Sequence, residues 1–206
     1  EIDRGLVGSE MCIRDRPLDK GSTPLFVASR KGHLDVVSIL LEHGADIDKA
    51  DDDGRTPLFI ASWSGNDEVV SVLLEQGADI NKAWSIGLTP LLIASQKGHV
   101  NVVRVLLEHG ADIDKAMNSG ATPLFMASQN GHVDVVRVLV EQGADINKPR
   151  ASNGCTPLYV ASEKGHMDVV RMLLEQGADI DKANKNGFTP LLIASQNGHV
   201  DVVRVL

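Results

Sequence analysis

Apolar side chains recur at helical spacing in short segments along most of the chain. Residues 67–76, DEVVSVLLEQ, carry one such stripe: Val69, Val70, Leu73 and Leu74. This spacing predicts an amphipathic helix of about ten residues. Asp67 and Glu68 favour its start, because acidic side chains stabilise the positive end of a helix, and Gly77 favours its end.

A second short helix is predicted just before that segment. Thr56 can cap it with its hydroxyl, and Pro57 suits the first helical position because its missing N–H has no partner there. Gly65 ends this helix, and residues 78–86 favour a turn or a short hairpin. Helices this short are marginal alone, so each pair must bury its apolar faces against neighbouring pairs.

This unit repeats through residues 17–206. The dipeptide Thr-Pro marks six copies at intervals of 33, 33, 33, 34 and 33 residues: Thr23-Pro24, Thr56-Pro57, Thr89-Pro90, Thr122-Pro123, Thr156-Pro157 and Thr189-Pro190. The copies start at Gly21, Gly54, Gly87, Gly120, Gly154 and Gly187. A stack of such units presents an extended surface rather than one enclosed pocket, which favours binding over catalysis.

The fourth copy illustrates a family pattern that all six copies follow in large part. It contains Thr122-Pro123-Leu124, Ala127, Gly131-His132, Val135-Val136, Leu139 and Gly143-Ala144-Asp145. These residues resemble the ankyrin repeat, whose period is 33 residues. The resemblance covers residues 21–206 and implies an all-α solenoid of stacked helix-turn-helix units with hairpin-like finger turns. It also implies a scaffold that recognises proteins through its concave face and finger tips, and not an enzyme.

The chain departs from the ankyrin pattern at one position in every copy. Where the family has the histidine of its T-P-L-H motif, the chain has Phe26, Phe59, Leu92, Phe125, Tyr159 and Leu192. Because the exchange is uniform, we predict an apolar packing ladder at this position. The second copy also has Asn66 where the other copies have the histidine of Gly-His.

The two ends of the chain differ from the regular repeat. Residues 1–16 share nothing with it, and residues 6–16, LVGSEMCIRDR, resemble a translated sequencing-library adapter. We therefore expect an artefactual segment; a native disordered N-terminus is the alternative. The sixth copy stops at Leu206, inside its second predicted helix. Repeat arrays usually end in capping units with polar outer faces, so we expect a fragment whose apolar ends allow end-to-end self-association.

Composition narrows the range of functions. With a net charge of −8, the chain is a poor match for the phosphates of a nucleic acid. No apolar run approaches the roughly 18 residues of a membrane-spanning helix, so we expect no membrane insertion by this segment. Cys12 lies in the adapter-like segment, which leaves Cys155 without an intramolecular disulfide partner. An intracellular and cytoplasmic location is therefore expected.

No residue pattern predicts a catalytic site, a metal or a cofactor. Five histidines share one repeat position, which stacking spaces by about 8–10 Å, too far apart to share one ion: His33, His99, His132, His166 and His199. The aspartates after Gly-Ala are predicted to shape the finger turns through side-chain to backbone bonds: Asp46, Asp79, Asp112, Asp145 and Asp179. Other copies fill the position of Cys155 with unrelated residue types, which disfavours a nucleophile at this position.

The positions that vary between copies predict where a partner binds. They lie at the finger tips, between Gly and Thr, and in the two residues before the glycine that ends each first helix. Both tryptophans occupy such positions, and tryptophan is enriched in binding hot spots. We predict a hydrophobic anchor and three outlying contacts: Trp63, Trp84, Ile86 and Leu88, and then Arg55, Met117 and Phe188. The alternative is that Trp63 and Trp84 pack on each other or on the finger stems.

The leading interpretation is an adaptor or scaffold that binds a protein partner. The alternative is an array that recruits or regulates within a larger enzyme, channel or secreted effector.

An extra residue among residues 149–153 produces the 34-residue interval between the fourth and fifth Thr-Pro. It is either a neutral insertion or a finger reshaped for a partner, since hairpin tips accept insertions readily.

Overall fold

The computed structural model describes residues 21–206, in which twelve helices form six pairs. The first helices of the pairs are α2 (Pro24–Lys31), α4 (Pro57–Ser64), α6 (Pro90–Lys97), α8 (Pro123–Asn130), α10 (Pro157–Lys164) and α12 (Pro190–Gln196). The second helices are α3 (Leu34–Glu42), α5 (Asp67–Glu75), α7 (Val100–Glu108), α9 (Val133–Glu141), α11 (Met167–Glu175) and α13 (Val200–Val203). The adapter-like segment lies outside the described residues, so its interpretation stays a prediction.

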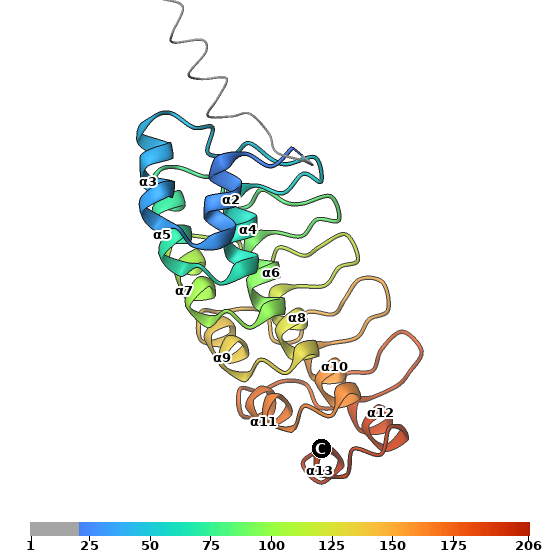
Figure 1. The fold of residues 1–206 in the computed structure, drawn as a ribbon. Helices are drawn as coiled ribbons and strands as arrows, with labels where there is room; N and C mark the ends of the chain where they lie inside the picture. The colour runs from blue at the N-terminus through green and yellow to red at the C-terminus, as the bar shows by residue number, and fades with distance from the viewer. Residues whose placement is uncertain (1–20) are drawn as a thin grey trace, which may run out of the picture.

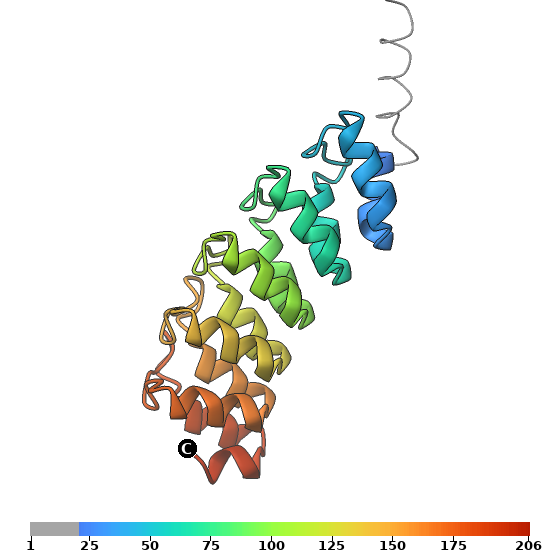
Figure 2. The ribbon, with the colours of Figure 1, turned by 90° about the vertical axis from the view of Figure 1, so that its left-hand side faces the viewer.

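The six pairs stack in chain order into one elongated array. Figure 1 shows the row of first helices between the row of second helices and a row of long loops, and Figure 2 shows the second helices stacked side by side. Each helix packs against its partner in the pair and against its counterpart in the next pair. No strand forms within residues 21–206, and the predicted all-α solenoid is confirmed.

Each first helix begins at the threonine that the sequence predicts. Thr56 is extended, and its Oγ1 accepts a hydrogen bond from the N–H of Phe59 at 3.1 Å. The same cap recurs in all six units. Gly65 ends α4 in the left-handed region, at a φ of +79°, which glycine adopts without strain. The local sequence thus sets both ends of the helix.

The main apolar core runs along the whole stack. It includes Val69, Val70 and Leu73 of the predicted stripe of α5, and the partly buried Leu74 packs against it. In units one to five the leucine after Thr-Pro joins the same core, and Leu58 and Leu124 are fully buried there. Because inner units bury their stripes against neighbours on both sides, the stability of the stack is shared among the interfaces between units.

The loops between pairs close as narrow hairpins. In the loop before α6, the N–H of Trp84 donates to the carbonyl of Leu88 at 2.9 Å, and equivalent bonds recur in the other loops, as the predicted finger turns require. The loop before α10 contains the extra residue. There the N–H of Gly154 donates to the carbonyl of Arg150, four residues back rather than three. The insertion therefore lengthens one hairpin tip while the bond across its stem is kept.

The repeated histidine ties each unit to the one before it. The Nε2–H of His99 donates to the carbonyl of Trp63 at 3.0 Å. The same bond recurs in three further units: His132, His166 and His199. In unit two the amide of Asn66 takes over this role and donates to the carbonyl of Ser29 at 2.8 Å. These side chains therefore belong to the scaffold.

The aspartate after each Gly-Ala shapes its finger, as predicted. Asp79 Oδ1 accepts the N–H of Asn81 at 3.0 Å, and the N–H of Asp79 donates to the carboxylate of Asp48 in the preceding finger at 3.2 Å. The bond within the finger recurs in the other units, and the bond between fingers recurs along the stack. This row of carboxylates and amides links the bases of the fingers.

A second apolar cluster joins the first helices to the fingers. It contains side chains that replace the family's histidine, such as Phe59 and Tyr159, together with buried finger residues such as Leu88 and Cys155. The replacing side chain is buried in units one to five, so the predicted packing ladder is confirmed there. Leu192 is 49% exposed because it lies at the end of the stack.

Candidate partner-binding surface

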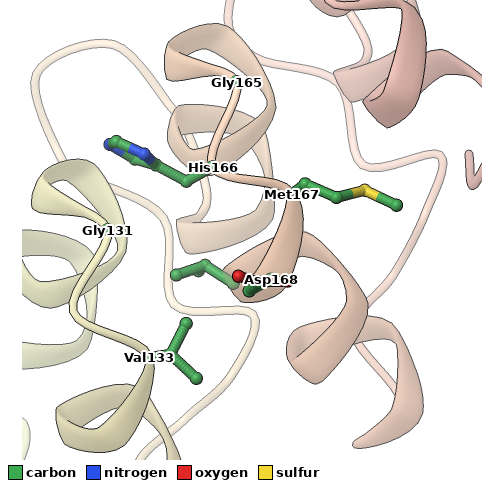
Figure 3. A pocket seen from close by; sticks show the side chains of 7 residues that line it. Gly131, Val133, Gly165, His166, Met167 and Asp168 are labelled. Carbon is green, nitrogen blue, oxygen red and sulfur yellow. The ribbon is translucent and has the colours of Figure 1, made fainter.

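Depressions lie between neighbouring units of the stack. One of about 280 Å³ lies between units four and five, where Gly131 and Val133 approach His166 and Met167 (Figure 3). The His166 Nε2–H already donates to the carbonyl of Gln129 at 3.0 Å, and the Met167 side chain points away from Val133. The residues that line this depression include no nucleophile beside a base and no pair of groups placed for acid–base catalysis.

Metal binding and the thiol of Cys155 are the other kinds of chemistry that the side chains could offer. Within residues 21–206, no three side chains of histidine, cysteine, aspartate or glutamate gather where they could hold a metal ion. Cys155 is a free buried thiol, and burial raises its pKa above the usual value, an effect that a hydrogen bond from the Asn184 amide at 3.8 Å partly offsets. Because the thiolate is the reactive form, this environment disfavours Cys155 as a nucleophile.

Trp63 is a partly exposed aromatic residue at the end of α4. It is 37% exposed, and its ring lies against Phe59 with the centroids 6.2 Å apart and the planes at 55°. The Lys97 ammonium, at the end of α6, lies 4.5 Å from the centroid of the indole, within the range of a cation–π interaction. The two contacts hold the indole in place and leave part of it accessible.

Trp84 lies in the finger before α6 and contacts the same phenyl ring. Its centroid is 5.6 Å from that of Phe59, and its Nε1–H donates to the carbonyl of Asp53 in the preceding finger at 2.6 Å. The side chain is half-buried, with its polar edge satisfied. Phe59 therefore joins the two tryptophans, which come from different elements of the fold.

Ile86 and Leu88 lie in the same finger but differ in exposure. Ile86 is 45% exposed, and its carbonyl accepts the N–H of Asn118 from the next finger at 3.0 Å. Leu88 is 4% exposed and belongs to the second apolar cluster. It therefore supports the surface from beneath and offers little area to a partner. We call the partly exposed set of Trp63, Trp84 and Ile86 the tryptophan patch.

Two of the three predicted outlying residues lie in fingers that contact the patch: Arg55 in the finger before it and Met117 in the finger after it. The Nη2 of Arg55 lies 2.6 Å from the buried carboxylate of Asp51 and 2.7 Å from the carboxylate of Asp53, so ion pairs within the finger engage it. Met117 and Phe188 are half-buried and pack on the second apolar cluster in two later fingers. Contact of these three residues with a partner stays a prediction.

Phe59 and Lys97 contribute to this surface without belonging to the predicted anchor. The sequence places Phe59 in the packing ladder, where it is buried, but does not indicate that both indoles contact it. Lys97 is one of the two variable residues before the glycine that ends a first helix, as is Trp63. Because Lys97 and Trp63 both lie at these variable positions, comparison of the copies could have identified Lys97 as a surface candidate.

Together, the stack and its variable surface define a class of protein, a helical solenoid with a constant scaffold and a variable face for recognition. Sequence models of ankyrin repeats match residues 4–84, 82–150 and 158–206. The chain therefore belongs to the ankyrin repeat family. Ankyrin repeats are generally protein–protein interaction modules and are typically not catalytic.

No curated protein matches this chain. Within residues 21–206, no helix combines the length and the apolar character needed to cross a membrane. The tryptophan patch is the most distinctive part of the variable surface, since it contains both tryptophans of the chain.

Proposed function

We propose that this chain is an adaptor or scaffold module that binds a partner protein through its finger tips and the face formed by its first helices. The tryptophan patch is the anchor of this surface, and binding requires no cofactor and no nucleic acid. One observation carries the proposal: two partly exposed indoles are held against Phe59 at variable positions of an otherwise constant scaffold. Truncation of such aromatic anchors often costs about 2 kcal/mol or more of binding free energy.

Replacing Trp63 and Trp84 together with alanine should abolish partner binding and leave the far-UV circular dichroism of the helices largely intact. Both side chains lie at the surface, whereas the main core lies elsewhere in the stack. A photo-crosslinking amino acid at Ser85, between Trp84 and Ile86, measures the binding in an extract of the source cells. We expect one partner to be captured by the wild-type chain and lost in the double variant.

Lys185 provides the matched position for that experiment. It is exposed and holds the place of Ser85 in the finger before α12, far along the stack from the patch. A crosslinker at Lys185 should not capture the same partner. Equal capture from both positions, or capture that survives the double alanine substitution, would contradict the proposed site.

The second candidate function is recruitment or regulation within a larger enzyme, channel or secreted effector. The same surface would then bind a domain of that protein or its target. The complete coding sequence distinguishes the two functions, because a catalytic or membrane domain beside the array would reassign its role.

We propose a cytoplasmic location for the chain, since the buried free thiol of Cys155 suits a reducing compartment.

We also propose that isolated chains of this sequence associate end to end. Leu192 at one end of the stack and Val36 at the other are 49% and 46% exposed, whereas their counterparts in inner units, such as Leu92 and Val69, are buried. The two end faces therefore match surfaces that already pack together inside the stack. Sedimentation velocity should detect oligomers that grow with concentration, and Leu192→Glu should shift them to monomer. A wild-type chain that stays monomeric at high concentration would contradict this proposal.

A further inference from the structure

The net charge of the described stack is concentrated in its first two units. Residues 21–86 carry eleven acidic and five basic side chains, whereas residues 87–206 carry twelve and eleven. The first two units therefore hold a net charge of −6, and the other four hold −1. The tryptophan patch lies in unit two, at the end of α4 and in the finger before α6. Electrostatic complementarity at this end favours a partner that carries basic groups.

The acidic groups nearest the patch lie in the first finger. Asp52 and Asp53 are exposed there, and the Asp53 carbonyl accepts the indole N–H of Trp84 at 2.6 Å. Arg55 pairs with Asp53 and with the buried Asp51. Residues 51–55 hold three carboxylates and one cation, so this part of the finger is negative. A basic side chain of a partner that reached Trp84 would therefore meet carboxylates beside it.

Basic groups gather at the opposite edge of the same surface, where the first helices end. Arg30 and Lys31 are the exposed last residues of α2, and Lys97, the exposed last residue of α6, lies over the ring of Trp63. The equivalent positions in units four to six carry less positive charge: Gln129 and Asn130, Glu163 and Lys164, Gln196 and Asn197. Among the compared units, a net positive charge at this edge is therefore found only in units one and three, on either side of the unit that holds the patch.

We propose that the tryptophan patch binds an extended segment of a partner protein in one fixed direction. A basic side chain of the segment lies at Asp52 and Asp53, apolar side chains lie on the tryptophan patch, and an acidic side chain lies at Lys97. The reverse direction would bring like charges together at both edges, which disfavours it. This inference rests on the proposed function and adds the chemistry and the orientation of the partner.

The length of α4 sets the spacing of the charges in the partner segment. Its eight residues, Pro57–Ser64, rise about 12 Å along the helix axis. An extended chain advances about 3.3 Å per residue, so about four residues cover that distance. We expect the basic and the acidic side chain of the segment to be about four to six positions apart, with apolar residues between them.

Random dodecapeptides displayed on phage are a suitable probe for this surface. They are selected on the whole chain at low salt, and clones that also bind the Trp63→Ala/Trp84→Ala variant are removed. The selected peptides should carry a basic residue, an apolar pair and an acidic residue in one constant order. As synthetic peptides they should bind Lys97→Glu about tenfold or more weakly, and replacing their acidic residue with lysine should restore the affinity for that variant.

Lys164→Glu is the matched control. Lys164 holds the position of Lys97 in unit five, away from the patch, so its reversal should leave peptide binding unchanged. Selected peptides that depend on the tryptophans but lack a constant charge order, or that ignore Lys97→Glu, would overturn the proposed direction and leave the proposed function intact. A selection that yields no peptide dependent on the tryptophans would count against both.

Discussion

Leu124→Ala is expected to lower the free energy of unfolding by about 2–5 kcal/mol. Leu124 follows the Thr-Pro of unit four, is 0% exposed and lies in the main core. Alanine removes most of its side chain and leaves a cavity that the surrounding helices can fill only in part. Because α8 packs against both α6 and α10, the loss weakens the stack on both sides of unit four.

Leu191→Ala is the matched control for that substitution. Leu191 holds the same position in unit six but is 43% exposed at the end of the stack. Its truncation should cost less than about 1 kcal/mol, since a surface site lacks the cavity term. Urea denaturation followed by far-UV circular dichroism measures both variants. Equal losses at the two sites would show that stacking does not bury this position as described.

Gly98→Ala is expected to destabilise the chain by about 2–4 kcal/mol. Gly98 ends α6 at a φ of +78°, which is costly for a residue with a Cβ. The added methyl group would lie 2.7 Å from Nδ1 of His132 in the next unit. The imidazole would have to move, and its Nε2–H bond to the carbonyl of Gln96, now 2.9 Å, would be lost. Backbone strain and the loss of the hydrogen bond between units both lower the free energy of unfolding.

Gly110→Ala separates those two effects. Gly110 has a φ of +83°, but an added Cβ would meet nothing within 4 Å. It should therefore cost only the backbone strain, about 1–2 kcal/mol. Urea denaturation compares the variants, and amide hydrogen exchange should quicken at the contact of units three and four in Gly98→Ala alone. If the two glycine variants lost the same stability, the histidine contact between units would not be as close as described.

Most of the fold can be predicted from the sequence because its rules are local and repeated. Thr56 caps a helix through its own hydroxyl, and Gly65 ends that helix through a conformation that other residues avoid. The shared positions of the histidines and aspartates predict scaffold roles, and their bonds to backbone groups explain why the positions recur. Since each unit packs only on its neighbours, the order of the units along the chain also gives their order in the stack.

The candidate surface could be predicted only in part. Comparison of the copies identifies Trp84, Ile86 and Leu88 as variable positions but does not separate exposed from buried ones. Leu88 is buried because the position between Gly and Thr faces the second apolar cluster, as the buried Ala121 and Cys155 show in later units. A position can therefore vary in sequence and still belong to the interior.

By itself, the sequence determined the number of units, the ends of their helices and the division between scaffold and variable positions. Only the tertiary structure decided which variable side chains reach solvent, and that Lys97 lies over the ring of Trp63. The physical reason is the range of the interactions involved. Helix caps and glycine conformations act within a few residues, whereas the contact between Lys97 and Trp63 joins neighbouring units of a stack and exists only once those units have packed.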